Sequence, residues 1–136
     1  HMPTKTFINL AVTNLNKTIG FFTRLGFTFN EEFTDAHATC MIISDNCYVM
    51  LLTEPFFKKF TKKHVADSHK TTEVIIALSA ESQEKVDEMC KTAFEAGGKK
   101  YKEADDKDNM YGWGFQDIDG HLWEVIYMKP NQIVKV

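Results

Sequence analysis

The chain has almost no arginine: of its 16 basic residues, only Arg24 carries a guanidinium group. A site that clamps a multiply charged anion usually depends on bidentate guanidinium contacts, so this scarcity argues against such a ligand. The remaining basic residues are lysines scattered along a chain of formal net charge −3, which leaves no basic patch for nucleic acid. We therefore expect no nucleic-acid partner.

Cysteine is also sparse, and no two cysteines have the close spacing of a metal-binding pair. The odd set of three, Cys40, Cys47 and Cys90, is typical of reduced thiols buried in a cytosolic protein. No apolar run approaches membrane-spanning length, and the chain opens without the basic-then-apolar segment of a secretion signal. These features favour a cytoplasmic protein with no membrane partner.

The chain contains a predicted order of elements that occurs twice. Its 136 residues, 43% hydrophobic and 26% charged, fit one folded domain. Each half predicts strand, helix, strand, strand, strand, and the two helices stop at Gly26 and at Gly97. The predicted strands are 7–12, 27–33, 38–44 and 47–53, then 73–79, 99–103, 110–116 and 121–128. A repeat of this kind strongly constrains the fold.

We divide the chain into a first βαβββ module at 3–54, a partly helical connector at 55–72 and a second module at 73–130, which predicts the α+β class. The first half of the connector carries Phe56, Phe57 and Phe60 among four lysines. Contact with a membrane surface is one interpretation. We favour the other, in which the phenylalanines cover the core and the lysines lie in water.

Two segments resemble motifs of one known superfamily. Residues 7–27 (FINLAVTNLNKTIGFFTRLGF) are similar to its opening strand and helix, where a V-x-D-L turn precedes an aromatic pair and L-G-F. Residues 110–128 (MYGWGFQDIDGHLWEVIYM) resemble its closing strands, with a D-x-D-G turn and a glutamate four residues after the glycine. The chain thus resembles the vicinal oxygen chelate (VOC) superfamily of glyoxalase, bleomycin-resistance and extradiol dioxygenase proteins, most closely a bacterial lactoylglutathione lyase-like subgroup.

This resemblance implies a glyoxalase fold, in which the two modules form a curved mixed sheet around a cavity. It also implies a homodimer, because related domains commonly pair. In metal-dependent members, side chains on the first, fourth, fifth and eighth strands hold one divalent ion. The resemblance assigns these positions to Phe7, to Met50 or Leu51, to Glu73 and to Glu124.

Two of the four assigned positions are apolar, and the strict glyoxalase set of ligands is missing from the sequence. An ion bound by fewer than three protein groups is easily lost, so we expect no tightly held metal cofactor. The alternative is a divalent ion held by Glu73 and Glu124. A shift of the first position by two residues reaches only Asn9, which is a weak ligand.

Glu73 and Glu124 are the candidate catalytic residues, and we expect both to point into the same cavity. Apolar neighbours there would raise the pKa of a carboxyl group. Glu124 would be a general base, as the resemblance to glyoxalases implies, or either acid would anchor donor groups of a ligand. An equally strong interpretation is structural, with each acid satisfied by backbone N–H groups or water.

Aromatic residues alternate along the last two predicted strands, beginning with Tyr111, Trp113 and Phe115. Alternation with period two places each set on one face of a sheet. One set would pack under the helices, and the other would line the cavity and bind a flat or apolar ligand. The predicted cavity residues are Phe7, Asn9, Met50, Leu51, Tyr111 and Trp113.

Three functions are consistent with these features. The residues favour a protein that binds or sequesters a small apolar or aromatic molecule without the usual metal site, similar to the bleomycin-resistance branch. The resemblance favours a lactoylglutathione lyase-like enzyme that uses Glu124 as its base, with or without a metal. The third alternative is a degenerate family member that acts through dimer or partner contacts.

Overall fold

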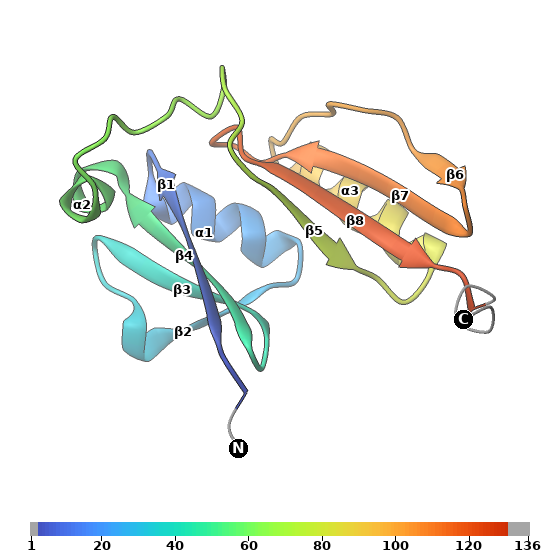
Figure 1. Cartoon of the computed structure of the whole chain (residues 1–136), viewed down its shortest axis with the longest axis horizontal. Helices are drawn as coiled ribbons and strands as arrows, with labels where there is room; N and C mark the ends of the chain where they lie inside the picture. Colours follow the sequence, from blue (N-terminus) through green and yellow to red (C-terminus); the bar gives the residue numbers. More distant parts are fainter. Residues whose placement is uncertain (1–2, 131–136) are drawn as a thin grey trace. The chain divides into compact units, whose positions relative to one another are not determined.

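The chain forms two compact units, one ending at Ala66 and the other beginning at Asp67 (Figure 1). The computed structural model describes residues 3–130. Each unit has the strand and helix order of a βαβββ module, so the predicted α+β class is confirmed. The strands hydrogen-bond into two four-stranded mixed sheets, one in each unit. Each unit is described by itself below.

In the first unit, one helix covers one face of the sheet, and in Figure 1 this helix lies behind the strands. The strands are ordered β1-β4-β3-β2, with β1 and β4 parallel and the other pairs antiparallel. The elements are β1 (Thr6–Val12), α1 (Leu15–Arg24), β2 (Thr28–Asn30), the 3-10 turn η1 (Glu31–Phe33), β3 (Ala38–Ser44) and β4 (Cys47–Thr53).

The predicted strand at 27–33 is wrong in its second half. The Asn30 side chain accepts a hydrogen bond of 3.0 Å from the backbone N–H of Glu32 and so begins the short turn η1. Asparagine side chains commonly compete in this way with the hydrogen bonds of a strand.

Helix α1 has sequence-encoded ends and one buried face. The Asn14 side chain caps its N-terminus by accepting a hydrogen bond of 3.0 Å from the Lys17 N–H. Gly26, with φ of 99°, lets the chain turn away after the last helical residue. Its buried face, which packs on the sheet, consists of Leu15, Thr18, Phe21 and Phe22.

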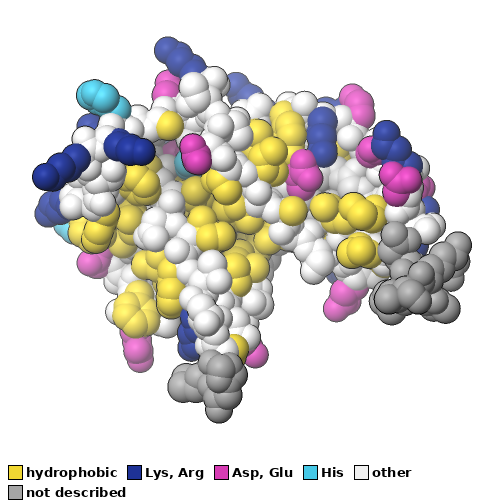
Figure 2. All heavy atoms as spheres, viewed as in Figure 1, with side chains coloured by type: hydrophobic (Ala, Val, Ile, Leu, Met, Phe, Trp, Pro, Cys, Tyr) yellow, Lys and Arg dark blue, Asp and Glu magenta, His cyan; other side chains and the backbone are white. Residues whose placement is uncertain are grey.

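The connector begins with two short helical segments, α2 (Glu54–Phe57) and η2 (Lys58–Phe60). Figure 2 shows lysine side chains gathered over this part of the molecule. Phe56 and Phe57 are half-buried, but Phe60 is 69% exposed, so the prediction that all three phenylalanines cover the core is wrong for Phe60. No helix within residues 3–130 has the length and apolar character needed to cross a membrane.

The second unit repeats this architecture, with strands ordered β5-β8-β7-β6 and one long helix behind them in Figure 1. Ser82 caps that helix, Gly97 follows its C-terminus at a φ of 108°, and Val86, Cys90 and Ala93 form its buried face. The elements are β5 (Ile75–Ser79), α3 (Gln83–Glu95), β6 (Asp105–Lys107), β7 (Met110–Gln116) and β8 (Leu122–Met128).

The predicted strand at 99–103 does not form. Only Lys99 bridges to β7: it exchanges two backbone hydrogen bonds with Gln116, of 2.9 and 2.7 Å. The chain then leaves the sheet and rejoins it at Asp105, where β6 begins. Residues 100–104 therefore form an arc beside β7 that is free to contribute side chains to the sheet surface.

The D-x-D-G turn before β8 has a structural role. The buried carboxylate of Asp117 accepts hydrogen bonds from the backbone N–H groups of Asp119 and His121 and from the Trp123 indole, at 2.9, 3.0 and 2.9 Å. A Cβ at Gly120 would lie 2.8 Å from the backbone of Ser68, so only glycine fits there. These contacts fix the start of β8 and thereby the position of Glu124.

Candidate functional site

The two faces of the second sheet differ in what covers them. Helix α3 packs on one face, where Phe115, Trp123 and Val125 are fully buried. The opposite face carries the two glycines of β7, Gly112 and Gly114. Because successive side chains of a strand point to opposite faces, every aromatic residue of β7 lies on the α3 side.

Tyr111 and Trp113 therefore do not line a cavity on the helix-free face, and that prediction is wrong. The Tyr111 hydroxyl donates a 2.5 Å hydrogen bond to Asp87 of α3, and this contact raises the pKa of Tyr111 to about 12. The Trp113 ring packs edge-on against Phe94 of α3, with 5.6 Å between centroids. Alternation correctly grouped the aromatic residues on one face, but that face is the core.

On the helix-free face, the ring of Tyr101 lies over Gly114. A Cβ placed on Gly114 would come within 2.6 Å of the Tyr101 hydroxyl oxygen and 2.7 Å of the Trp123 carbonyl oxygen, so the ring occupies the space of the missing side chain. In the strand register, Gly114 lies opposite Glu124, and Glu124 lies opposite Ala77. The arc at 100–104 thus brings a tyrosine to Glu124 of β8.

Glu124 is held by two donors from this arc. Its Oε2 atom accepts a hydrogen bond of 2.8 Å from the Lys102 ammonium and one of 3.0 Å from the Tyr101 hydroxyl. The Lys102 contact lowers the pKa of Glu124, with a smaller contribution from Tyr101, and together they outweigh the opposing effect of partial burial. The prediction of a raised pKa for Glu124 is therefore wrong, because the sequence did not reveal these two donors.

Tyr101 remains a hydrogen-bond donor under ordinary conditions. Burial and the neighbouring carboxylate of Glu124 raise the pKa of the Tyr101 hydroxyl well above its usual value, since both disfavour a phenolate. The Trp113 indole N–H donates a hydrogen bond of 3.0 Å to the Lys102 carbonyl oxygen and anchors the arc from the core side. The cluster of Tyr101, Lys102 and Glu124 is thus held from both sides of the sheet.

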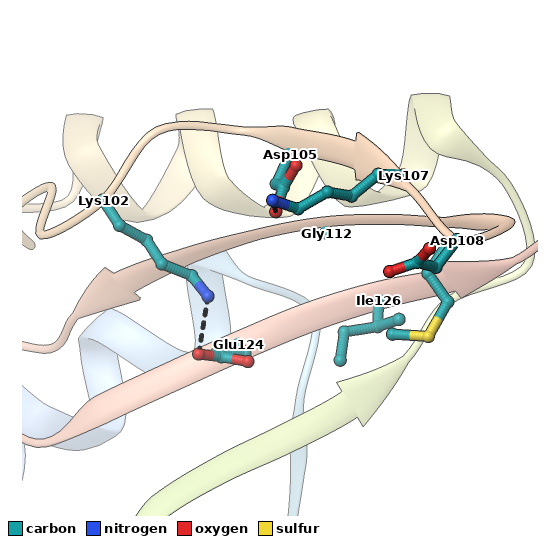
Figure 3. Close-up of a pocket in the computed structure, with 8 residues that line it drawn as sticks. Lys102, Asp105, Lys107, Asp108, Gly112, Glu124 and Ile126 are labelled. Atoms are coloured by element: carbon teal, nitrogen blue, oxygen red, sulfur yellow. Dashed lines mark hydrogen bonds and ion pairs between the residues drawn. The ribbon is translucent and has the colours of Figure 1, made fainter.

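A hollow of about 180 Å³ lies beside this cluster on the helix-free face. In Figure 3, Lys102 and Glu124 lie together at one end, Asp108 lies at the other, and Ile126 lies between them. Met110, Gly112 and Ile126 supply apolar wall. The full lining is Lys102, Asp105, Lys107, Asp108, Met110, Gly112, Glu124 and Ile126.

Glu73 does not belong to this site. It is exposed and precedes β5 by two residues, whereas the residue of β5 beside Glu124 is Ala77. Glu73 lies at a bend four residues before Ala77, and it is not among the residues that line the hollow. The prediction that both acids point into one cavity is therefore wrong.

The internal repeat shows which residue takes the fifth-strand position. Phe7 lies seven residues before Asn14, the cap of α1, and Ile75 lies seven residues before Ser82, the cap of α3. Their strand partners also correspond, since Phe7 pairs with Tyr48 and Ile75 with Leu122. Ile75, not Glu73, is thus the counterpart of Phe7.

The helix-free face of the first sheet carries Phe7, Asn9 and Met50. Phe7 is 53% exposed and stacks on Tyr48, with ring centroids 5.1 Å apart. Asn9 pairs with Met50, which is half-buried. Leu51 is fully buried and one residue out of phase, so it faces α1 and does not line a cavity on this face. Of the two predicted fourth-strand positions, Met50 shares the face of Phe7.

These positions do not fit a divalent metal ion. Three of the four, Phe7, Met50 and Ile75, offer no nitrogen or oxygen donor, and Glu124 already gives one oxygen to Lys102 and Tyr101. Hard or borderline ions need several nitrogen or oxygen ligands. Within residues 3–130, no three or more His, Cys, Asp or Glu side chains are grouped so that they could bind a metal.

Two βαβββ units, each with one helix-covered and one helix-free sheet face, define a protein of the glyoxalase fold class. The family model of the Glyoxalase/Bleomycin resistance protein/Dioxygenase superfamily matches residues 6–125, and the chain belongs to this superfamily. No curated protein sequence matches the chain significantly.

Solved structures with the same fold cover nearly the whole chain. A hypothetical protein from S. aureus is 26% identical, with a TM-score of 0.79 over 93% of this chain and 95% of that one. A glyoxalase-related enzyme from Fulvimarina pelagi has a TM-score of 0.79 at 16% identity, over 93% of this chain and 88% of that one. The fosfomycin resistance protein of Listeria monocytogenes has a TM-score of 0.66 at 19% identity, over 93% and 94%.

Proposed function

We propose that the protein binds a small, mostly apolar molecule in the hollow beside Glu124 and that binding does not depend on a metal ion. The observation that carries this proposal is the contact of the Lys102 ammonium with Glu124, at 2.8 Å. A cation supplied by the chain itself compensates the one acidic side chain at the four family positions. The apolar wall of Met110 and Ile126 favours a ligand with an apolar body.

The site also limits the kind of apolar ligand. Tyr111 and Trp113 lie behind the sheet, so they offer no ring face to the hollow. Contacts to Ile126, Met110 and the bare backbone of Gly112 suit a compact aliphatic or single-ring group better than an extended flat one. The proposal therefore keeps the small apolar ligand of the sequence analysis and drops stacking on those two aromatic residues.

The test combines metal analysis with ligand screening on the purified protein. We expect less than about 0.1 equivalent of any divalent ion after purification without chelator, and the same value in Glu124→Gln. Compact apolar compounds should raise the melting temperature of the wild type, because a ligand that binds only the folded state stabilises it. A stoichiometric ion that is lost in Glu124→Gln would refute the proposal.

A matched control separates the site from a general charge effect. Glu103→Gln removes an exposed carboxylate of the same arc, one that pairs with Lys100 at 2.9 Å and lies outside the hollow. We expect ligand-induced stabilisation to fall in Glu124→Gln and to equal that of the wild type in Glu103→Gln. Equal loss in both variants would mean that the ligand does not bind beside Glu124.

A second function, glyoxalase-type proton transfer with Glu124 as base, is favoured by one observation: β8 keeps a carboxylate at the position where the resemblance implies a base. One feature opposes it. The pKa of Glu124 is lowered by Lys102, and a weakly basic carboxylate is a poor acceptor of a carbon-bound proton. A hemithioacetal isomerisation assay decides between the two, because activity lost in Glu124→Gln would establish the enzyme.

A further inference from the structure

Lys102 and Glu124 form a pair with no net charge, and each retains unused hydrogen-bonding capacity. An ammonium has three N–H donors. Among the described residues, only Oε2 of Glu124 accepts a hydrogen bond from the Lys102 ammonium. Oε2 also accepts from Tyr101, whereas Oε1 has no partner among residues 3–130. In Figure 3 the second oxygen of Glu124 lies on the side away from Lys102, toward Ile126.

The hollow is therefore lined by donors, on Lys102, and by an acceptor, Oε1 of Glu124. We propose that it selects a neutral ligand group that has an acceptor next to a donor, a carboxamide or a lactam, attached to an apolar body. This inference rests on the proposed function, because it names the ligand class of the same site. The ligand carbonyl oxygen accepts from the Lys102 ammonium, and its amide N–H donates to Oε1 of Glu124.

Charge explains why a neutral group is preferred. A carboxylate that approaches Lys102 also approaches Glu124, and an amine that approaches Glu124 also approaches Lys102, so each meets a like charge at close range. The other lysine of the hollow, Lys107, lies 3.7 Å from Asp105 and supplies no uncompensated cation. Asp108 is exposed at the far end of the hollow, where an amine is the competing ligand.

The hollow has room for one ring or a short branched chain. A buried apolar cavity of roughly 150 Å³ holds a benzene molecule, and the hollow measures about 180 Å³. Met110, Gly112 and Ile126 contact the apolar body, while Lys102 and Glu124 contact its polar group. A cyclohexane ring with one polar substituent matches these dimensions.

The experiment titrates the isotope-labelled full chain with four probes that share one ring, followed by NMR. The probes are cyclohexanecarboxamide, cyclohexanecarboxylate, cyclohexylmethylamine and methoxycyclohexane. We expect the carboxamide to bind about tenfold more tightly than each of the others, because it alone makes both hydrogen bonds. The shifted amide signals should include those of Gly112 and Ile126.

Three variants make the test specific. In Lys102→Met, the tenfold preference for the carboxamide should disappear. In Glu124→Gln, the Lys102 charge is no longer balanced, so the preference should change from the carboxamide to the carboxylate. Lys107→Met, a matched lysine of the same hollow, should keep the wild-type order of affinities. Dispersed amide spectra verify that each variant is folded.

The outcomes distinguish this inference from the proposed function. Equal binding of all four probes at the hollow would overturn the amide inference and leave the apolar ligand site standing. Tighter binding of the carboxylate or the amine to the wild type would also overturn the inference. If no probe shifts the signals of the hollow, both the inference and the proposed function fail.

Discussion

Replacement of Gly114 by alanine should destabilise the second unit far more than the same replacement at Gly112. The alanine Cβ at 114 would lie 2.6 to 2.7 Å from Tyr101 and 2.7 Å from the Trp123 carbonyl oxygen. At Gly112, the nearest atom is a side-chain carbon of Ile126 at 3.5 Å, an ordinary contact. The two positions lie two residues apart on the same strand and the same face, so they form a matched pair.

The magnitude follows from the contacts that must change. Tyr101 has to move off the sheet, which removes its hydrogen bond to the Glu124 carboxylate, worth about 1.5–3 kcal/mol. Overpacking against the Trp123 backbone adds about 1–3 kcal/mol. Alanine also lowers the entropy of the unfolded chain, which offsets about 0.4–1 kcal/mol of this loss of stability. We expect Gly114→Ala to lose about 3 kcal/mol of unfolding free energy and Gly112→Ala to lose less than about 0.5 kcal/mol.

Urea denaturation followed by tryptophan fluorescence measures this difference within the correct unit. Both tryptophans, Trp113 and Trp123, lie on strands of the second unit, so fluorescence reports on its unfolding. With a denaturant slope of about 2 kcal/mol per molar urea, a loss of 3 kcal/mol moves the midpoint by about 1.5 M. In a Tyr101→Ala background, Gly114→Ala should cost less, because one of the two clashes is already removed. Equal midpoints for the two alanine variants would refute this reasoning.

Three other predictions concern stability. Asp117→Ala should lower the unfolding free energy by about 2–4 kcal/mol, because it leaves the buried Trp123 indole N–H without its acceptor; a loss below about 1 kcal/mol in the fluorescence assay would contradict this. The pKa of Glu124 is lower in the folded protein than in the unfolded chain. The stability that ionised Glu124 adds is therefore present above its unfolded pKa and is lost as the pH falls through its folded pKa, so Lys102→Met should flatten the decrease of stability between about pH 5 and pH 3. An unchanged pH profile would argue against the ion pair. Addition of EDTA should leave the melting temperature unchanged within about 1 °C, whereas a drop of several degrees would indicate a structural metal.

The helix ends and the fold class could be predicted from the sequence because their signals are local. Asn14 caps α1 and Ser82 caps α3 through their own side chains, and a glycine at positive φ follows each helix. Such contacts span a few residues and do not depend on the rest of the fold. The repeat of these local signals was enough to predict two modules of the same type.

The register of β5 could not be predicted from the strand itself. The segment EVIIALS is almost continuously apolar, so it has no alternation to show which residues face the helix. Counting back from the Ser82 cap, as from Asn14 in the first half, identifies Ile75 in place of Glu73. The cap was a better reference point than the apolar run because its position in the fold is fixed by a hydrogen bond.

The donors to Glu124 were missed for a different reason. Tyr101 and Lys102 reach it only because the chain leaves the sheet after Lys99 and rejoins it at Asp105, and no local pattern in KKYKEAD marks that arc. The one signal was Gly114, since a glycine inside an otherwise aromatic strand often marks the close approach of another group. The identity of that group depends on tertiary structure.

Glu124 receives its compensating charge from the chain itself, through the Lys102 ammonium. A half-buried carboxylate needs a compensating charge or donors, whatever the rest of the site contains. Here both come from an arc outside the hydrogen-bonded ladder, so β7 and β8 keep full register around Gly114 and Glu124. Lys102 is attached to the chain, unlike an ion. Its remaining N–H groups can bind only a ligand that is not repelled by the neighbouring carboxylate of Glu124. The same pair that stabilises Glu124 in the fold therefore sets the chemistry that the hollow accepts.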